Sequence, residues 1–183
     1  MAAAVVGAAL LTGCSEKQEA NDTLPSSSPS ETAEALLELG PADFPVPDEA
    51  RTKDAAGAEA FLRYYVDLLN RQQSIPSGEA LRELGSECQD CLRIAQDLDE
   101  SAASGLKYRG GELSIVGEFG TAVSDEGANL SFIARINAGV QLDSSGTPVP
   151  GTESAAVERL PSGASLSWSA TDESWLIDAL SIG

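Results

Sequence analysis

The sequence predicts an α+β domain in which N-terminal helices pack on one face of an antiparallel sheet. Up to about residue 104, apolar side chains recur every three or four positions, which is the spacing of an amphipathic helix. Beyond Gly105 they recur at every second position, as in strands with one buried face. Helices followed by a run of strands are typical of the α+β class, because the sheet must bury its apolar face against the helices.

Three helices are expected. The first follows Asp54, a favoured N-cap residue, and runs up to Asn70; its apolar stripe comprises Ala58, Phe61, Leu62, Tyr65, Leu68 and Leu69. A shorter helix is expected over 77–85. A third is expected over 90–104 and ends at Gly105, because glycine readily adopts the left-handed conformation that closes a helix.

Five strands are expected after the helices. The ranges with a two-residue period are 107–119, 129–142, 155–160, 165–170 and 174–182. The clearest is 129–142, in which apolar residues from Leu130 to Leu142 alternate with mostly polar ones. Arg135 and Asn137 fall on its more polar face, so they are the residues we expect to be functional if that face is left open.

The first residues of the chain have the character of an export signal. Residues 1–12 are apolar and small, and the run is too short to span a membrane as a mature helix. It leads into Leu11-Thr12-Gly13-Cys14, which resembles the lipobox of bacterial lipoproteins, where cleavage before the cysteine frees a thiol that carries a diacylglycerol. The resemblance implies a signal peptide over 1–13, lipidation at Cys14, and anchoring on the extracytoplasmic face of the cell membrane. The alternative, an ordinary apolar helix with a buried Cys14, is disfavoured by the polar run that follows.

Residues 14–44 have the composition of a tether. They are rich in Ser, Glu, Pro and Thr, and such a segment buries too little apolar area to offset the entropy of ordering it. We expect a flexible acidic tether over 14–44 and the globular domain over 45–183. Within the tether, Gly40-Pro41 would end a short helix that carries Leu36, Leu37 and Leu39, and so short a helix is expected to be transient.

Cys88 and Cys91 form the remaining cysteine pair once Cys14 is lipidated. In an exported protein, two cysteines this close predict first a disulfide, here at the junction of the second and third helices. A redox-active CxxC motif is the first alternative, since a thiol at a helix N-terminus can have a lowered pKa. A metal site is the second, but two thiolates without histidine supply only half of a zinc site.

The overall composition excludes several functions. The chain contains no histidine, which removes Ser-His-Asp catalysis, Cys-His catalysis and His-based zinc sites. Its net charge is −18, with basic residues scattered singly, so nucleic acid is not an expected partner. No metal and no cofactor are expected, and no carboxylate stands at a spacing that marks it as catalytic.

Several short motifs resemble an uncharacterised family of actinobacterial lipoproteins, domain of unknown function 6318. They lie within about residues 45–120 and comprise Pro47-Asp48-Glu49-Ala50, Gly57-Ala58, Ala60-Phe61, Tyr64-Tyr65, Asn70, Cys88-Gln89-Asp90-Cys91 and Gly110-Gly111. The last two expected strands, with Trp168 and Trp175, are similar to the final hairpin of nuclear-transport-factor-2-like domains. This resemblance implies a curved sheet wrapped on the first helix as a cone, but it transfers no catalytic residue.

Two functional hypotheses follow. We favour a non-catalytic binding or interaction module, displayed on its lipid anchor in the cell envelope, whose partner is an unknown envelope protein or a small ligand. The alternative is a small-molecule carrier or a histidine-independent enzyme with a pocket at the mouth of the cone. Tyr65, on the core stripe of the first helix, would then line the pocket together with Arg135 and Asn137.

Overall fold

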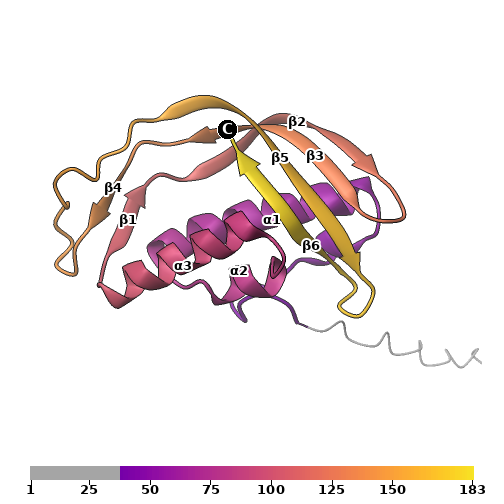
Figure 1. The fold of residues 1–183 in the computed structure, drawn as a ribbon, viewed down its shortest axis with the longest axis horizontal. Helices are drawn as coiled ribbons and strands as arrows, with labels where there is room; N and C mark the ends of the chain where they lie inside the picture. The colour runs from indigo at the N-terminus through magenta and orange to yellow at the C-terminus, as the bar shows by residue number, and fades with distance from the viewer. Residues whose placement is uncertain (1–37) are drawn as a thin grey trace, which may run out of the picture. The chain divides into compact units, whose positions relative to one another are not determined.

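The computed structural model of the protein describes residues 38–183. Its elements in chain order are a 3-10 helix η1 (Asp48–Arg51), helices α1 (Ala55–Ser74), α2 (Glu79–Leu84) and α3 (Gln89–Ala103), and strands β1 (Lys107–Gly110), β2 (Leu113–Val123), β3 (Ala128–Ile136), β4 (Gly139–Leu142), β5 (Val157–Ser169) and β6 (Ser174–Ile182). Within this range every helix precedes every strand, so the predicted α+β class is confirmed (Figure 1). The signal peptide, Cys14 and most of the predicted tether lie outside the described residues.

The strands form two antiparallel sheets. The larger has the order β2-β3-β5-β6, and the smaller pairs β1 with β4. In Figure 1 the large sheet arches over the helices, with α1 in contact with β2 and β3 and α3 in contact with β6. The helices therefore cover the apolar face of the large sheet, as the fold class requires. Among the described residues, no helix combines the length and the apolarity needed to cross a bilayer.

Helix α1 begins where its sequence predicts. The side chain of Asp54 accepts a hydrogen bond from the backbone N–H of Gly57 at 2.7 Å, which satisfies one of the free donors of the first turn. The helix continues four residues beyond Asn70, to Ser74. The side-chain amide of Asn70 connects α1 to the start of β2. Its Nδ2 donates a hydrogen bond to the carbonyl of Leu113, and its Oδ1 accepts one from the N–H of Leu113, both at 2.8 Å.

One carboxylate bridges helices α2 and α3. Asp99 of α3 accepts a hydrogen bond from the backbone N–H of Gly78, just before α2, at 2.7 Å. The same carboxylate accepts a hydrogen bond from Arg82 Nη2 at 2.5 Å, and the two side chains form an ion pair. The hydrogen bond from Gly78, followed by the one from Arg82, holds the pKa of Asp99 below its ordinary value.

Two of the expected strands are each divided in two. The expected strand 107–119 breaks between β1 and β2 at Gly110 and Gly111, whose φ angles are +71° and +80°. The expected strand 129–142 breaks between β3 and β4, where Gly139 approaches the backbone of Gly111 too closely for a Cβ atom. Glycine at these positions lets both segments turn out of the large sheet, so that β1 and β4 pair with each other in the small sheet.

The expected strands 155–160 and 165–170 are instead one strand, β5. Pro161 lies inside it, opposite Ile133 of β3. Strand β6 ends at Ile182, which pairs with Ser162, so β5 is an edge strand from Pro161 toward Val157. Proline is tolerated there because an edge strand does not need every N–H for pairing.

The domain begins earlier than residue 45. Leu39 is 8% exposed, and its carbonyl accepts a hydrogen bond from the N–H of Val46 at 2.9 Å. The ring of Phe44 stacks on Tyr64 of α1 at a centroid distance of 5.2 Å. Residues 38–44, which the composition assigned to the tether, therefore pack on the domain.

The core between helices and sheet is filled by large side chains. Trp175 of β6 and Phe61, Tyr65 and Leu68 of α1 have no exposed surface. The indole N–H of Trp175 donates to the carbonyl of Thr52 at 2.8 Å, so the polar atom of this buried ring is satisfied. The interior beside α1 is consequently a packed core.

Candidate functional site

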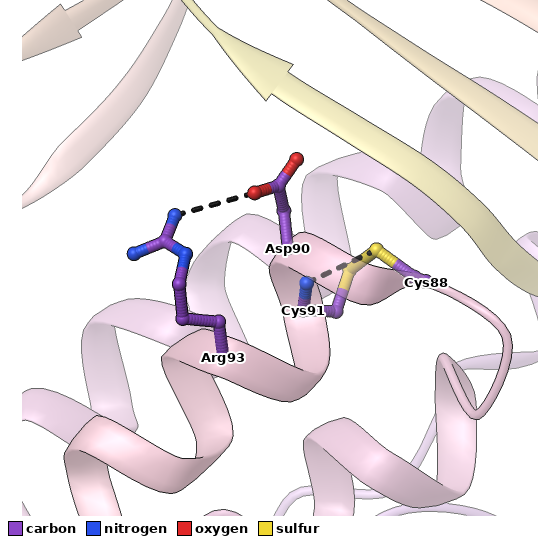
Figure 2. Close-up of a disulfide and its surroundings, with 4 residues drawn as sticks. All are labelled: Cys88, Asp90, Cys91 and Arg93. Atoms are coloured by element: carbon purple, nitrogen blue, oxygen red, sulfur yellow. Dashed lines mark hydrogen bonds and ion pairs between the residues drawn. A yellow bond between two sulfur atoms is a disulfide. The ribbon is translucent and has the colours of Figure 1, made fainter.

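Cys88 and Cys91 form a disulfide at the start of α3 (Figure 2). Their Cα atoms are 5.2 Å apart, and neither residue has exposed surface. Cys88 is the N-cap residue, and its sulfur accepts a hydrogen bond from the N–H of Cys91 at 3.2 Å. Asp90 and Arg93 lie on the exposed side of the same turn and form an ion pair at 3.3 Å (Figure 2). Burial of both sulfurs favours a structural role over redox exchange, because exchange requires a thiolate to reach one of them.

Tyr65 does not reach an open pocket. It lies on α1 facing the core, has no exposed surface, and its hydroxyl has no hydrogen bond partner within the described part of the chain. Burial raises the pKa of this hydroxyl above its ordinary value. A side chain without exposed surface cannot contact a ligand in solution unless the core opens.

Arg135 and Asn137 lie on the opposite, solvent-facing side of the sheet. Arg135 forms an ion pair with Glu158 at 3.3 Å, and both side chains are about half exposed or more. Asn137 donates to Glu112 at 3.0 Å, and this hydrogen bond is the main cause that lowers the pKa of Glu112. The structure therefore does not bring Tyr65, Arg135 and Asn137 together as one pocket.

A hollow of about 460 Å³ lies on the small sheet formed by β1 and β4. We name it the arm hollow. Its lining comprises Gln73, Tyr108, Gly110, Gly111, Ile136, Gly139, Val140, Gln141, Thr152 and Ser154. Ile136, which lies between Arg135 and Asn137 in sequence, is part of this lining, whereas Arg135 and Asn137 are not.

The glycine kink between β1 and β2 borders the arm hollow. A Cβ atom on Gly111 would lie 3.6 Å from the side-chain oxygen of Gln73, inside the lining. Gly110-Gly111 stood out in the sequence as a motif, but the two-residue period placed it within a strand. The Gly110-Gly111 motif could therefore have indicated the kink, but the two-residue period of the apolar residues favoured an unbroken strand.

Polar side chains of the arm hollow are fixed by mutual hydrogen bonds. The Tyr108 hydroxyl accepts from Gln141 Nε2 at 3.0 Å and lies 3.3 Å from Ser101 Oγ. The hydroxyl of Thr152 accepts from the backbone N–H of Gln141 at 3.1 Å. These groups are held in place before any ligand arrives, which reduces the entropic cost of binding.

The chemistry of the arm hollow is that of a neutral binding surface. Its lining offers a phenol, two amides, two hydroxyls and glycine backbone, with no ionisable carboxylate, amine or guanidinium, in a chain of net charge −18. Such groups recognise uncharged polar molecules through hydrogen bonds and ring contacts. Over residues 38–183, no group of three or more acidic or cysteine side chains is placed to hold a metal ion.

No family model and no curated protein matches the chain. Among solved structures, it is similar to the intermembrane space region of the chloroplast protein ARC6, with a TM-score of 0.54 and 18% identity over 72% of this chain and 97% of that one. A protein from Catenulispora acidiphila matches with a TM-score of 0.34 and 14% identity over 69% of this chain and 94% of that one. At such identities the first match supports the α+β fold alone, and the second carries no argument.

Proposed function

We propose that the chain is a lipid-anchored protein of the cell envelope, whose α+β domain acts as a binding module outside the membrane. The arm hollow carries the binding part of this proposal, because it is preorganised and its lining is neutral. The lipobox-like Leu11–Cys14 and the buried disulfide support export, since disulfides persist in oxidising compartments. The motifs within residues 45–120 support membership of the domain of unknown function 6318 family, and the arched sheet supports a nuclear-transport-factor-2-like cone.

The anchor is tested by metabolic labelling with an alkynyl fatty acid in a bacterial host that exports the chain. We expect the wild type to carry label and Cys14→Ala to carry none, because the thiol of Cys14 is the acceptor of the lipid. Equal labelling of the two proteins would refute lipidation at this residue. The paired variant Cys88→Ala/Cys91→Ala is the control and should label as the wild type does.

A second candidate function, carriage of a small uncharged polar ligand, is favoured by the arm hollow itself. The expected result is that neutral polyols or amides produce saturable NMR shifts at Tyr108 and Gln141, whereas simple anions do not. Gly111→Val should abolish these shifts, because its side chain would project toward Gln73. Gly117→Val is the matched control, since Gly117 has a similar φ of +83° but nothing within 4 Å of its Cβ position. Loss of binding in both variants would point to backbone strain and not to the hollow.

A further inference from the structure

The polar groups that line the arm hollow differ in whether they still have a hydrogen to donate. A hydroxyl carries one hydrogen, whereas a side-chain amide carries two on its nitrogen and none on its oxygen. A hydroxyl whose hydrogen is already donated within the protein can only accept a hydrogen bond from a ligand. The hydrogen bonds among the lining residues therefore determine which kind of ligand the hollow suits.

The Tyr108 hydroxyl donates its only hydrogen within the protein. Ser101 Oγ donates to the carbonyl of Asp97 at 2.8 Å, so Ser101 is the acceptor and Tyr108 the donor in their 3.3 Å contact. Tyr108 can then only accept from Gln141, whose Nε2 lies 3.0 Å away. This chain of hydrogen bonds fixes the Gln141 amide with its nitrogen on Tyr108, so its Oε1 is directed elsewhere.

The amide of Gln73 is oriented by a backbone carbonyl. Its Nε2 donates to the carbonyl of Gly111 at 3.4 Å, and its Oε1 lies 3.6 Å from the position of a Cβ atom on Gly111, a lining residue. Within residues 38–183, neither this oxygen nor Gln141 Oε1 has a hydrogen bond partner. The buried side-chain oxygens without a partner in that range are those of Tyr65 and Gln72. Solvent therefore reaches the amide oxygens of Gln73 and Gln141.

The other two hydroxyls of the lining are engaged as donors as well. Thr152 donates to the carbonyl of Val149 at 2.7 Å, and Ser154 donates to the carbonyl of Gly139 at 3.4 Å. All three lining hydroxyls thus have their hydrogen engaged within the protein. The lining offers a ligand mainly acceptors, which include two amide oxygens, and one remaining N–H on each glutamine.

The same lining favours a neutral ligand. It contains no carboxylate to pair with a cation, and an unpaired charge is costly to remove from water. The net charge of −18 disfavours anions. Ile136 and Val140 add apolar surface to the hollow. A carbon ring that bears several hydroxyl groups matches these features, because its hydroxyls can donate to the oxygens while its C–H groups cover the apolar side chains.

We propose that the arm hollow binds a polyol whose hydroxyl groups donate to Gln73 Oε1 and Gln141 Oε1, an inference that rests on the binding function proposed for this hollow. A ligand without donors removes water from these two oxygens and gives them no hydrogen in return, which is unfavourable. Tyr108 acts as a positioning residue, since it fixes the Gln141 amide. A free cyclic polyol and a sugar unit of a glycan share this chemistry.

The test is an NMR titration of the full chain, followed at the side-chain amides of Gln73 and Gln141. The polyols are myo-inositol and methyl α-D-glucopyranoside. The donor-free compounds are the permethylated form of the glucoside and 1,4-dioxane, a smaller ring that controls for the bulk of the added methyl groups. We expect both polyols to bind about tenfold or more tightly than either donor-free compound, because the hydrogen bonds to the two oxygens are lost.

The outcomes separate this proposal from the binding function on which it rests. Equal binding of polyols and donor-free compounds would overturn the donor requirement and leave a site for neutral ligands intact. No saturable shift with any compound would overturn the binding function too. Tighter binding of guanidinium than of either polyol would overturn the preference for a neutral ligand. Tighter binding of myo-inositol indicates a free polyol, and tighter binding of the glucoside indicates a glycan.

Variants test the individual side chains. Gln73→Leu and Gln141→Leu should each weaken polyol binding about fivefold, because each removes one acceptor. The control Gln96→Leu removes an exposed amide of α3 outside the lining and should bind as the wild type does. Tyr108→Phe keeps the ring but lets the Gln141 amide rotate, so it should reduce the preference for polyols over 1,4-dioxane. An unchanged preference in Tyr108→Phe, or equal weakening in all three leucine variants, would overturn the proposal.

Discussion

Among single residues, Asp99 illustrates how one side chain can replace a local capping signal. The α2 helix begins at Glu79 without a side-chain N-cap, and the carboxylate that bonds the preceding Gly78 N–H comes from 21 residues later in the chain. Arg82 completes the link from α2 to the same carboxylate. The short α2 helix therefore depends on α3 for its position.

We expect Asp99 to make the domain sensitive to acid. Since its pKa in the folded protein is lowered from the ordinary 3.8, its contribution to stability is complete above that value and is lost as the pH falls through the folded pKa. Urea unfolding of Asp99→Asn should show a smaller loss of stability below about pH 4 than the wild type. Asp125→Asn, in the turn between β2 and β3, is the control; the same change in both variants would contradict a specific role for Asp99.

At the level of elements, the disulfide and the start of α3 act as one unit. Cys88 caps α3, because its sulfur accepts a hydrogen bond from the backbone N–H of Cys91. Both lie beside the end of α2, where a Cβ atom on Gly85 would meet the Cβ of Cys91 at 3.4 Å. The bond thus fixes the direction in which α3 leaves the loop.

Removal of this bond should lower stability moderately. The loop that it closes is short, so Cys88→Ala/Cys91→Ala is expected to reduce the free energy of unfolding by about 2 kcal/mol, mainly through the entropy of the unfolded chain. Urea unfolding of the variant beside oxidised and reduced wild type measures the effect. If the variant and the oxidised wild type unfold at the same urea concentration, the bond contributes no stability.

On the scale of the whole molecule, the segment that enters the domain is part of the core. Leu39 and Val46 are buried, and Gly40 lies so close to the Tyr64 hydroxyl that a Cβ atom would clash with it. Tyr64 in turn donates a hydrogen bond to the carbonyl of Phe44 at 2.9 Å. The segment 39–46 therefore packs against α1.

A truncation series tests where the domain begins. A chain that starts at Glu38 should be as stable as the full chain, whereas one that starts at Pro45 should lose about 3 kcal/mol, because Leu39 and the ring of Phe44 no longer cover α1. Thermal or urea unfolding of the two fragments gives the difference. Equal stability would mean that 38–44 adds nothing and that the domain begins at residue 45.

The sequence by itself determined the α+β class and the three helices, and it favoured a disulfide between Cys88 and Cys91 over the redox and metal alternatives. Each of these depends on residues close together in the chain: a helical stripe repeats within four residues, Asp54 caps its own helix, and two cysteines three positions apart can meet without any tertiary contact. Local periodicity and spacing are sufficient for such features.

Only the tertiary structure decided the arm hollow, the division of the long strands, and the positions of Tyr65, Arg135 and Asn137. The arm hollow is lined by residues as far apart in the sequence as Gln73 and Ser154. A two-residue period shows which residues alternate, but it does not show where a strand leaves one sheet for another, nor which face the helices cover. Those outcomes depend on contacts between segments far apart in the chain, which no local pattern contains.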